Sequence, residues 1–275
     1  MAGEGRRGFS GLSLRVVTGL ALAAGAAALI LLTPLWVLTL AAAAAAGLAM
    51  WEYMRMVEPG PWNWDAWLCV ALAVGVCACS FLGPAGSAAA LGLALALGAA
   101  LSLAGPDELA DKLAKTRRRG WGLVYTGGLL AVLLTIAGLP QGRLLLLFVI
   151  AAVVAADSGA YFAGHLWGRR KMAPRISPGK TWEGLAGGML CAALIGALFA
   201  ALLLADVPAP AGAALGLALG LVSVLGDLLE SLVKRVHGVK DSGDIFPGHG
   251  GILDRIDGLL LAGPAMLLLR MLWWQ

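Results

Sequence analysis

The sequence carries little charge. Only 13% of its 275 residues are Asp, Glu, Lys or Arg, whereas 60% are hydrophobic. Soluble globular domains contain about 25% charged residues, so this composition excludes an ordinary soluble protein. Apolar runs of about 20 residues, the length that crosses the hydrocarbon core of a bilayer as a helix, recur from end to end. We therefore predict an all-α, polytopic membrane protein.

Cysteine and histidine are also scarce. The four cysteines lie in apolar runs without a partner at metal-ligand spacing, which favours small buried side chains over a zinc site or a disulfide. The three histidines, His165, His237 and His249, lack metal-ligand spacing too. Only His249, which lies between glycines in the run PGHGG, is a candidate for a direct role.

Long polar loops are missing as well. By our predicted boundaries, no loop on the side that carries the cations exceeds about 25 residues, which is too short for a separate nucleotide-binding domain. Any site must therefore be built from loops and helix ends at the membrane face.

Pro and Gly separate the apolar runs, and we predict about nine membrane spans from them. They are 14–32, 35–50, 66–83, 87–104, 122–139, 143–163, 184–205, 211–232 and 258–273. Pro34 and the apolar run after it favour a retained helical hairpin over a cleaved signal peptide. Residues 105–120 are predicted to form a short amphipathic surface helix. The glycines at 212, 216 and 220 share one helix face, which favours close helix packing.

The cations predict the orientation. All of the 20 Lys and Arg residues except Arg143 and Arg270 fall on the N-terminal tail and on loops of the same side. Excess Lys and Arg marks the cytoplasmic side, so we expect the N-terminus there, in a multi-pass protein of the inner or plasma membrane. We divide the chain into N-terminal membrane helices with a basic amphipathic segment, 1–121, and a C-terminal catalytic region, 122–275.

Acids within the predicted spans are the first candidates for chemistry, because ionisable groups are costly in a membrane. Asp157 lies late in the sixth span, and Asp227 and Glu230 lie late in the eighth. Four polar residues of the eighth span fall on one helical stripe, at i, i+4, i+8 and i+11: Ser223, Asp227, Ser231 and Lys234. Glu230 is placed to pair with Lys234.

A second pair of acids begins the last span. Asp254 and Asp257 are three residues apart and face one way, so together with Asp227 they predict an oxygen-rich pocket of the kind that Mg²⁺ prefers. Nearby cations, including Arg235 and Arg255, are suited to phosphate. Carboxylates, a hard cation and basic residues without an obvious nucleophile indicate phosphoryl or nucleotidyl transfer.

A second basic stretch covers residues 164–184. Gly179-Lys180-Thr181 is similar to the end of a P-loop, but Pro174 stands where glycine is required, and a membrane helix precedes the stretch instead of a strand. We instead predict that Ser177, Lys180 and Thr181 grip phosphate at the entry to the seventh span, where free backbone N–H groups attract anions.

The longest motif resembles the signature of the phosphatidate cytidylyltransferase (CDP-diacylglycerol synthase) family. It reads Ser231-Leu-Val-Lys234-Arg235, Lys240-Asp241, Phe246-Pro247-Gly248-His249-Gly250-Gly251 and Asp254-Arg255-Ile256-Asp257. The stretch from Asp157-Ser158 to Gly184 is similar to the family's second block. Gly179 and His165 depart from it, because a basic residue is usual at both positions.

The resemblance implies that CTP reacts with phosphatidic acid, giving CDP-diacylglycerol and pyrophosphate for phospholipid biosynthesis, with Mg²⁺ as cofactor. It implies membrane lipids and no nucleic acid as partners, and the Gly-rich faces leave a homodimer open. The implied catalytic residues are Asp227, Lys234, Asp254 and Asp257, of which the three aspartates would hold metal. The implied substrate-binding residues are Asp157, Ser177, Lys180, Thr181, Ser223, Ser231, Arg235, Lys240, Asp241, His249 and Arg255.

Three other functions remain open at this point. A CTP-dependent polyprenol or phytol kinase-like enzyme would use a metal ion and phosphate-binding residues in the same way. An ion-coupled transporter could use Asp157 and Asp227 as its ion site, although both acids lie near one face and no inverted repeat is evident. A CDP-alcohol phosphatidyltransferase is disfavoured, because its DG…AR…G…D…D pattern is absent from this sequence.

Overall fold

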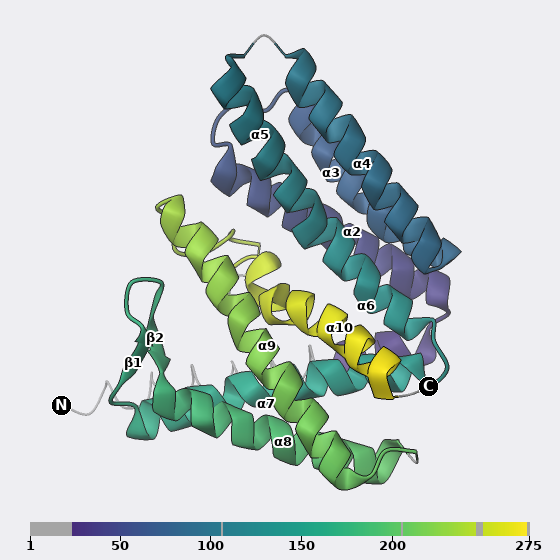
Figure 1. The fold of residues 1–275 in the computed structure, drawn as a ribbon, viewed down its shortest axis with the longest axis vertical. Coiled ribbons are helices and arrows are strands. Elements are labelled where there is room, and N and C mark those ends of the chain that lie inside the picture. The colour runs from purple at the N-terminus through teal and green to yellow at the C-terminus, as the bar shows by residue number, and fades with distance from the viewer. Residues whose placement is uncertain (1–23, 106, 205, 246–249, 274–275) are drawn as a thin grey trace, which may run out of the picture.

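The computed structural model describes residues 24–105, 107–204, 206–245 and 250–273. Residues 24–32 are helical. The N-terminal elements that follow are α2 (Leu35–Val57), α3 (Trp64–Ala78), the 3₁₀ turn η1 (Cys79–Leu82), α4 (Pro84–Ala104), α5 (Leu109–Gly122), the π-helical turn η2 (Leu123–Gly128) and α6 (Leu129–Ala137). The C-terminal elements are α7 (Gly142–Trp167), β1 (Lys171–Ala173), β2 (Ser177–Thr181), α8 (Trp182–Leu203), α9 (Ala209–Val236) and α10 (Leu253–Trp273) (Figure 1).

The prediction of a polytopic helical membrane protein is confirmed. Among the described residues, seven helices are long and apolar enough to cross a membrane, and they cover the predicted spans from 35–50 to 211–232. Helix α10 covers the predicted span 258–273 but is not among those seven. Most of the first predicted span, 14–32, lies outside the described residues. The orientation of the helices stays a prediction.

The basic segment after α4 does not form a helix of its own. Helices α5 and α6 join through η2 into one span, Leu109–Ala137. Arg119 explains how a cationic segment can continue a membrane helix. Its guanidinium is 3% exposed and lies 2.9 Å from Glu58 Oε2 and 2.8 Å from Asp65 Oδ2. The positive charge is therefore neutralised by acids at the ends of α2 and α3.

A short antiparallel β-hairpin interrupts the helices, and the all-α prediction missed it. Strands β1 and β2 pair with Lys171 opposite Thr181. The backbone N–H groups of Arg169 and Arg170 donate to the Glu183 carboxylate at 3.1 and 3.2 Å, which fixes the base of the hairpin against the start of α8. The hairpin projects beyond the ends of α7 and α8 (Figure 1).

Small residues bring the C-terminal helices together. An added Cβ at Gly196 of α8 would lie 2.3 Å from the Gly212 carbonyl oxygen, and one at Gly216 would lie 2.2 Å from the Ala192 carbonyl oxygen. Only hydrogen fits at these contacts, so the backbones of α8 and α9 touch. The predicted packing face at 212, 216 and 220 is therefore confirmed, and it is used inside the chain.

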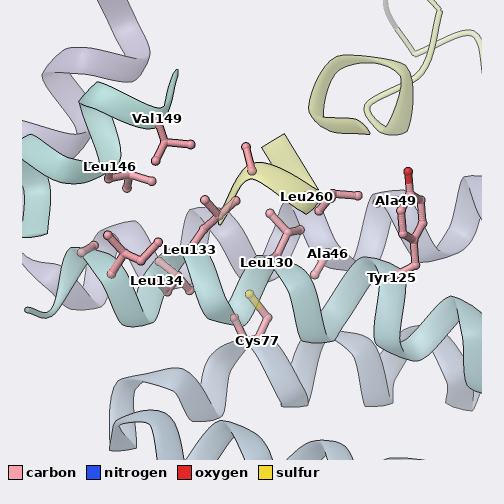
Figure 2. Close-up of a cluster of buried hydrophobic side chains, with 14 of the residues drawn as sticks. Ala46, Ala49, Cys77, Tyr125, Leu130, Leu133, Leu134, Leu146, Val149 and Leu260 are labelled. Atoms are coloured by element: carbon pink, nitrogen blue, oxygen red, sulfur yellow. The ribbon is translucent and has the colours of Figure 1, made fainter. Parts of the chain in front are cut away.

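Helix α10 joins the two regions of the chain, because it lies against α9 and α7 on one side and against α6 on the other (Figure 1). The hydrophobic cluster beneath it combines Ala46 of α2, Cys77 of α3, Leu130 of α6, Val149 of α7 and Leu260 of α10 (Figure 2). Cys69 and Cys77 are buried, as predicted, and the four cysteines are all free thiols.

Candidate active site

The site begins where α9 and α10 touch. An added Cβ at Gly226 would lie 2.6 Å from the Asp257 carbonyl oxygen and 3.2 Å from the Gly258 Cα atom. Asp227 directly follows Gly226, so this contact brings Asp227 and Asp257 from two helices to one place. The glycine was not singled out in the sequence, although its position beside Asp227 sets the distance between the two acids.

The β-hairpin supplies a cation to this place. Lys180 Nζ lies 2.6 Å from Asp227 Oδ2, and Ser231 Oγ donates to Asp227 Oδ1 at 3.2 Å. Arg235 Nε donates to the carbonyl oxygen of Ile176 at 3.2 Å, so the end of α9 also holds the turn of the hairpin. The structure thus brings together the two segments that resemble the family's motifs, the one from Asp157 to Gly184 and the one from Ser231 to Asp257.

A buried ion-pair network lies beside the contact. Lys234 forms ion pairs with Glu230, as predicted, and with Asp254, whose Oδ1 lies 2.5 Å from Lys234 Nζ. Asp254 Oδ2 accepts hydrogen bonds from Ser242 N at 2.9 Å, Ser242 Oγ at 2.8 Å and Gly251 N at 2.8 Å. Burial alone would raise the pKa of Asp254, but these donors outweigh it and lower the pKa to about 2. Both oxygens of Asp254 are therefore already engaged by protein groups.

Asp257 lies, like Asp254, just before the predicted span 258–273, but its environment differs from that of Asp254. Burial raises the pKa of Asp257 to about 7, and the Asp227 and Asp157 carboxylates contribute in the same direction. Asp157 interacts electrostatically with Lys180 and Arg255 as well. Three acids thus share one neighbourhood with cations.

Thr181, which was predicted to bind phosphate, and Ser223, which was predicted on the polar stripe of the eighth span, both form hydrogen bonds within the protein. Thr181 is 5% exposed and is the N-cap of α8, where its Oγ1 accepts a hydrogen bond from Gly184 N at 3.0 Å. Ser223 is 1% exposed and donates to the Gly220 carbonyl oxygen at 2.8 Å. Both hydroxyls have a local backbone partner, and their contact with substrate stays a prediction.

The other predicted contacts lie around the acids. Ser177 is half-buried at the start of β2, and Lys240 and Asp241 are exposed on the loop after α9. His249 lies outside the described residues. Among the residues that the structure does describe, no three His, Cys, Asp or Glu side chains are close enough to hold a metal ion by themselves.

Two residues from outside the family motifs, one on α2 and one on η2, reach this neighbourhood and were missed. Glu52 of α2 is fully buried and bonds to the loop before α10. Tyr125 of η2 is 2% exposed, its hydroxyl has no hydrogen-bond partner among the described residues, and it interacts electrostatically with Asp257, Glu230 and Asp227. Figure 2 shows its hydroxyl pointing away from α6. Glu52 escaped notice because the predicted span 35–50 ends before it, whereas α2 continues to Val57.

The comparisons agree with this picture. A model of the cytidylyltransferase family matches residues 13–273. The phosphatidate cytidylyltransferase of Haemophilus influenzae is 45% identical over 128 residues, covering 45% of this chain and 44% of that protein. The Pseudomonas aeruginosa enzyme of the same name is 44% identical over 174 residues, 63% of this chain and 64% of that protein. The Bacillus subtilis one is 41% identical over 151 residues, 54% of this chain and 56% of that protein. The matched segments thus span about half to two thirds of these relatives.

Proposed function

The chain belongs to the cytidylyltransferase family, and from that premise we propose that it transfers the cytidylyl group of CTP to phosphatidic acid. The products are CDP-diacylglycerol and pyrophosphate, as expected from relatives named phosphatidate cytidylyltransferase. The observation that carries the proposal is the contact between Lys180 and Asp227 beside Asp257. It joins cations and carboxylates at one helix end, which is what two phosphate-bearing substrates require.

The reaction needs no strong base. The second pKa of a phosphate monoester is about 6, so the lipid phosphate is largely dianionic near neutral pH and is itself the nucleophile. Its oxygen attacks the α-phosphorus of CTP, the bond from that phosphorus to the bridging oxygen breaks, and pyrophosphate leaves with the electron pair. The obstacle is repulsion between two polyanions, and fixed positive charge lowers that barrier.

We propose that Asp227 and Asp257 hold Mg²⁺. The donor set fits, because Mg²⁺ usually binds through one or two carboxylates and keeps waters and substrate phosphate oxygens as its other ligands. When bound, the ion supplies charge neutralisation between the substrates. Asp254 was predicted as a third ligand, but among the described residues it is held by four protein donors, against two for Asp227, and this supports a role in holding the loop.

Around these acids, Lys180 and Arg255 are the cations best placed for phosphate, because both interact with the acid cluster. Lys240 lies on the exposed loop and could contact the part of the nucleotide that faces water. The basic loops support a site at the cytoplasmic face of the inner or plasma membrane. There, phosphatidic acid would approach from the bilayer and CTP from the cytosol.

The test is turnover by the purified full chain in detergent. With CTP, phosphatidic acid and Mg²⁺ we expect pyrophosphate and CDP-diacylglycerol, and little of either without Mg²⁺. Phosphorylation of an isoprenoid alcohol in place of phosphatidic acid would favour the kinase alternative. Ion-driven transport in proteoliposomes without CTP turnover would favour the transporter.

A pair of variants connects the reaction to the hairpin. Lys180→Met should reduce turnover at least about 10-fold, whereas partly exposed ion pairs contribute at most about 1 kcal/mol, so its thermal stability should change little. Lys171→Met, on the neighbouring strand, is the matched control and should stay within about two-fold of the unchanged chain. Equal turnover of both variants would contradict the role of Lys180.

A further inference from the structure

Glu52 is a carboxylate in an otherwise apolar stretch of α2, and it is fully buried. Ionisable groups inside membrane helices are costly and are retained where they bind something specific. Nothing in the cytidylyltransfer chemistry described above uses this residue, and the N-terminal region was predicted to be generic membrane helices. The partners of its carboxylate therefore decide what it does.

Those partners lie about 200 positions away in the sequence. Glu52 Oε1 accepts a hydrogen bond from Ile252 N, and Oε2 accepts one from Leu253 N, both at 2.9 Å. These two N–H groups belong to the start of α10, where backbone donors have no partner within the helix and where the helix dipole favours negative charge. Glu52 thus caps α10 from another helix.

The carboxylate also organises the loop between α9 and α10, residues 237–252, called here the site loop; its residues 246–249 lie outside those described. Added Cβ atoms would lie 2.7 Å from Glu52 Oε1 at Gly243, and closer still to both Glu52 oxygens at Gly251. The loop backbone therefore passes close to the carboxylate at two points, and a side chain at either glycine would displace the carboxylate.

Ser242 extends this contact to the site. Its hydroxyl lies 3.1 Å from Glu52 Oε2 and 2.8 Å from Asp254 Oδ2, so its single proton can bond to either. Asp254 in turn holds Lys234 of α9. A continuous chain of hydrogen bonds and ion pairs thus runs from α2 through the site loop to α9, and each member of it is buried or half-buried.

We propose that Glu52 is a positioning residue that holds the site loop and the start of α10 in the arrangement that the reaction requires. The N-terminal region thereby completes the active site without touching substrate. Loss of Glu52 would leave α10 in place through its apolar contacts, but would release the N–H groups of Ile252 and Leu253 and the hydroxyl of Ser242. Asp254 follows Leu253 directly and Asp257 lies in the next turn of α10, so both would lose their fixed position.

The kinetic test of this proposal rests on the proposed function, whereas its structural test, by hydrogen exchange, does not. In Glu52→Gln the side chain keeps its size, but an amide NH₂ replaces one accepting oxygen and faces backbone donors. A charge-assisted hydrogen bond contributes about 1.5–3 kcal/mol, so we expect kcat to fall about 10- to 100-fold. The KM for CTP should change less than kcat, because Glu52 does not contact the nucleotide.

Hydrogen exchange by mass spectrometry supplies the second measurement. In Glu52→Gln, peptides that contain Ile252 and Leu253 should exchange at least about 10-fold faster, since charge-assisted bonds of this strength protect their amides. Glu58→Gln is the control, because Glu58 directly follows the same helix as its C-cap and pairs with Arg119. It should alter neither the exchange of those peptides nor kcat beyond about two-fold. Glu52→Asp, which keeps the charge but shortens the reach, should restore part of both properties.

Two results would overturn the proposal. One is a Glu52→Gln protein with unchanged turnover. The other is reduced turnover with unchanged exchange at the start of α10, which would place the effect of Glu52 elsewhere. If the unmodified chain shows no cytidylyltransfer at all, the proposed function fails, while the exchange comparison still decides whether Glu52 holds the loop.

Discussion

Gly226→Ala tests whether the touching backbones of α9 and α10 set the reacting geometry. The new methyl group would lie 2.6 Å from the Asp257 carbonyl oxygen, whereas ordinary contact begins at 3.4 Å, so the helices must part by about 0.8 Å. Overpacking of this kind costs about 1–3 kcal/mol, and the higher helix propensity of alanine offsets at most about 1 kcal/mol of it.

The kinetic effect should exceed the effect on stability. Misplacement of reacting groups by 1 Å can cost about 100-fold in rate, so we expect turnover to fall roughly 10- to 100-fold in a protein that still folds. The assay is pyrophosphate release at saturating CTP and phosphatidic acid, with thermal unfolding in the same detergent.

Gly75→Ala is the matched control. Gly75 lies within α3, and an added Cβ there meets no atom within 4 Å. Turnover and stability should therefore be unchanged or slightly improved, since alanine is the better helix former. If Gly226→Ala has the same turnover as Gly75→Ala, the distance between α9 and α10 does not control the reaction, and the reasoning is wrong.

Two further substitutions, at Tyr125 of η2 and at Arg119 of α5, distinguish a functional side chain from a structural one. Tyr125→Phe removes a buried hydroxyl that has no hydrogen-bond partner in the described part of the chain, which should leave the melting temperature unchanged or higher because an unsatisfied group costs about 1–3 kcal/mol. The kcat should fall if the hydroxyl serves the acids with which Tyr125 interacts, and an unchanged kcat would show that it does not. Arg119→Met leaves Glu58 and Asp65 without their buried cation, which should destabilise the protein by about 3–5 kcal/mol in thermal unfolding, and a loss below about 1 kcal/mol would contradict the neutralising role of Arg119.

Most of the fold follows from hydropathy. Apolar runs of spanning length, separated by Pro and Gly, predicted the helices, because a helix is the only open-chain structure that satisfies its own backbone within a bilayer. The predicted helix boundaries are wrong where a helix contains polar or charged residues. Helix α2 continues beyond its predicted end through Glu52, and α5 continues into α6, since in both cases the polar side chains find partners on other helices.

Within the site, contacts between neighbours on one helix were predicted, but contacts between elements were not. Helical spacing correctly placed Ser231 beside Asp227 and Glu230 beside Lys234, because neighbours at i+4 share a helix face. The contact between Lys180 and Asp227 required tertiary structure, and the hairpin that delivers the lysine has no apolar alternation to reveal it. The hydroxyls of Thr181 and Ser223 were predicted to contact substrate, which nothing tests; in the structure both bond to local backbone groups, as short polar side chains commonly do.

The distance in sequence between Glu52 and its partners has a consequence for biosynthesis. The ribosome makes α2 about 200 residues before the N–H groups that its carboxylate accepts. Until α10 is made, the Glu52 carboxylate lacks the Ile252 and Leu253 N–H groups that it accepts in the finished bundle. Membrane insertion of the last helix is therefore the step that both satisfies this carboxylate and assembles the acids of the site. A chain that stops before α10 would carry an unsatisfied acid in its second helix, the kind of feature by which a cell could distinguish unfinished copies from finished ones.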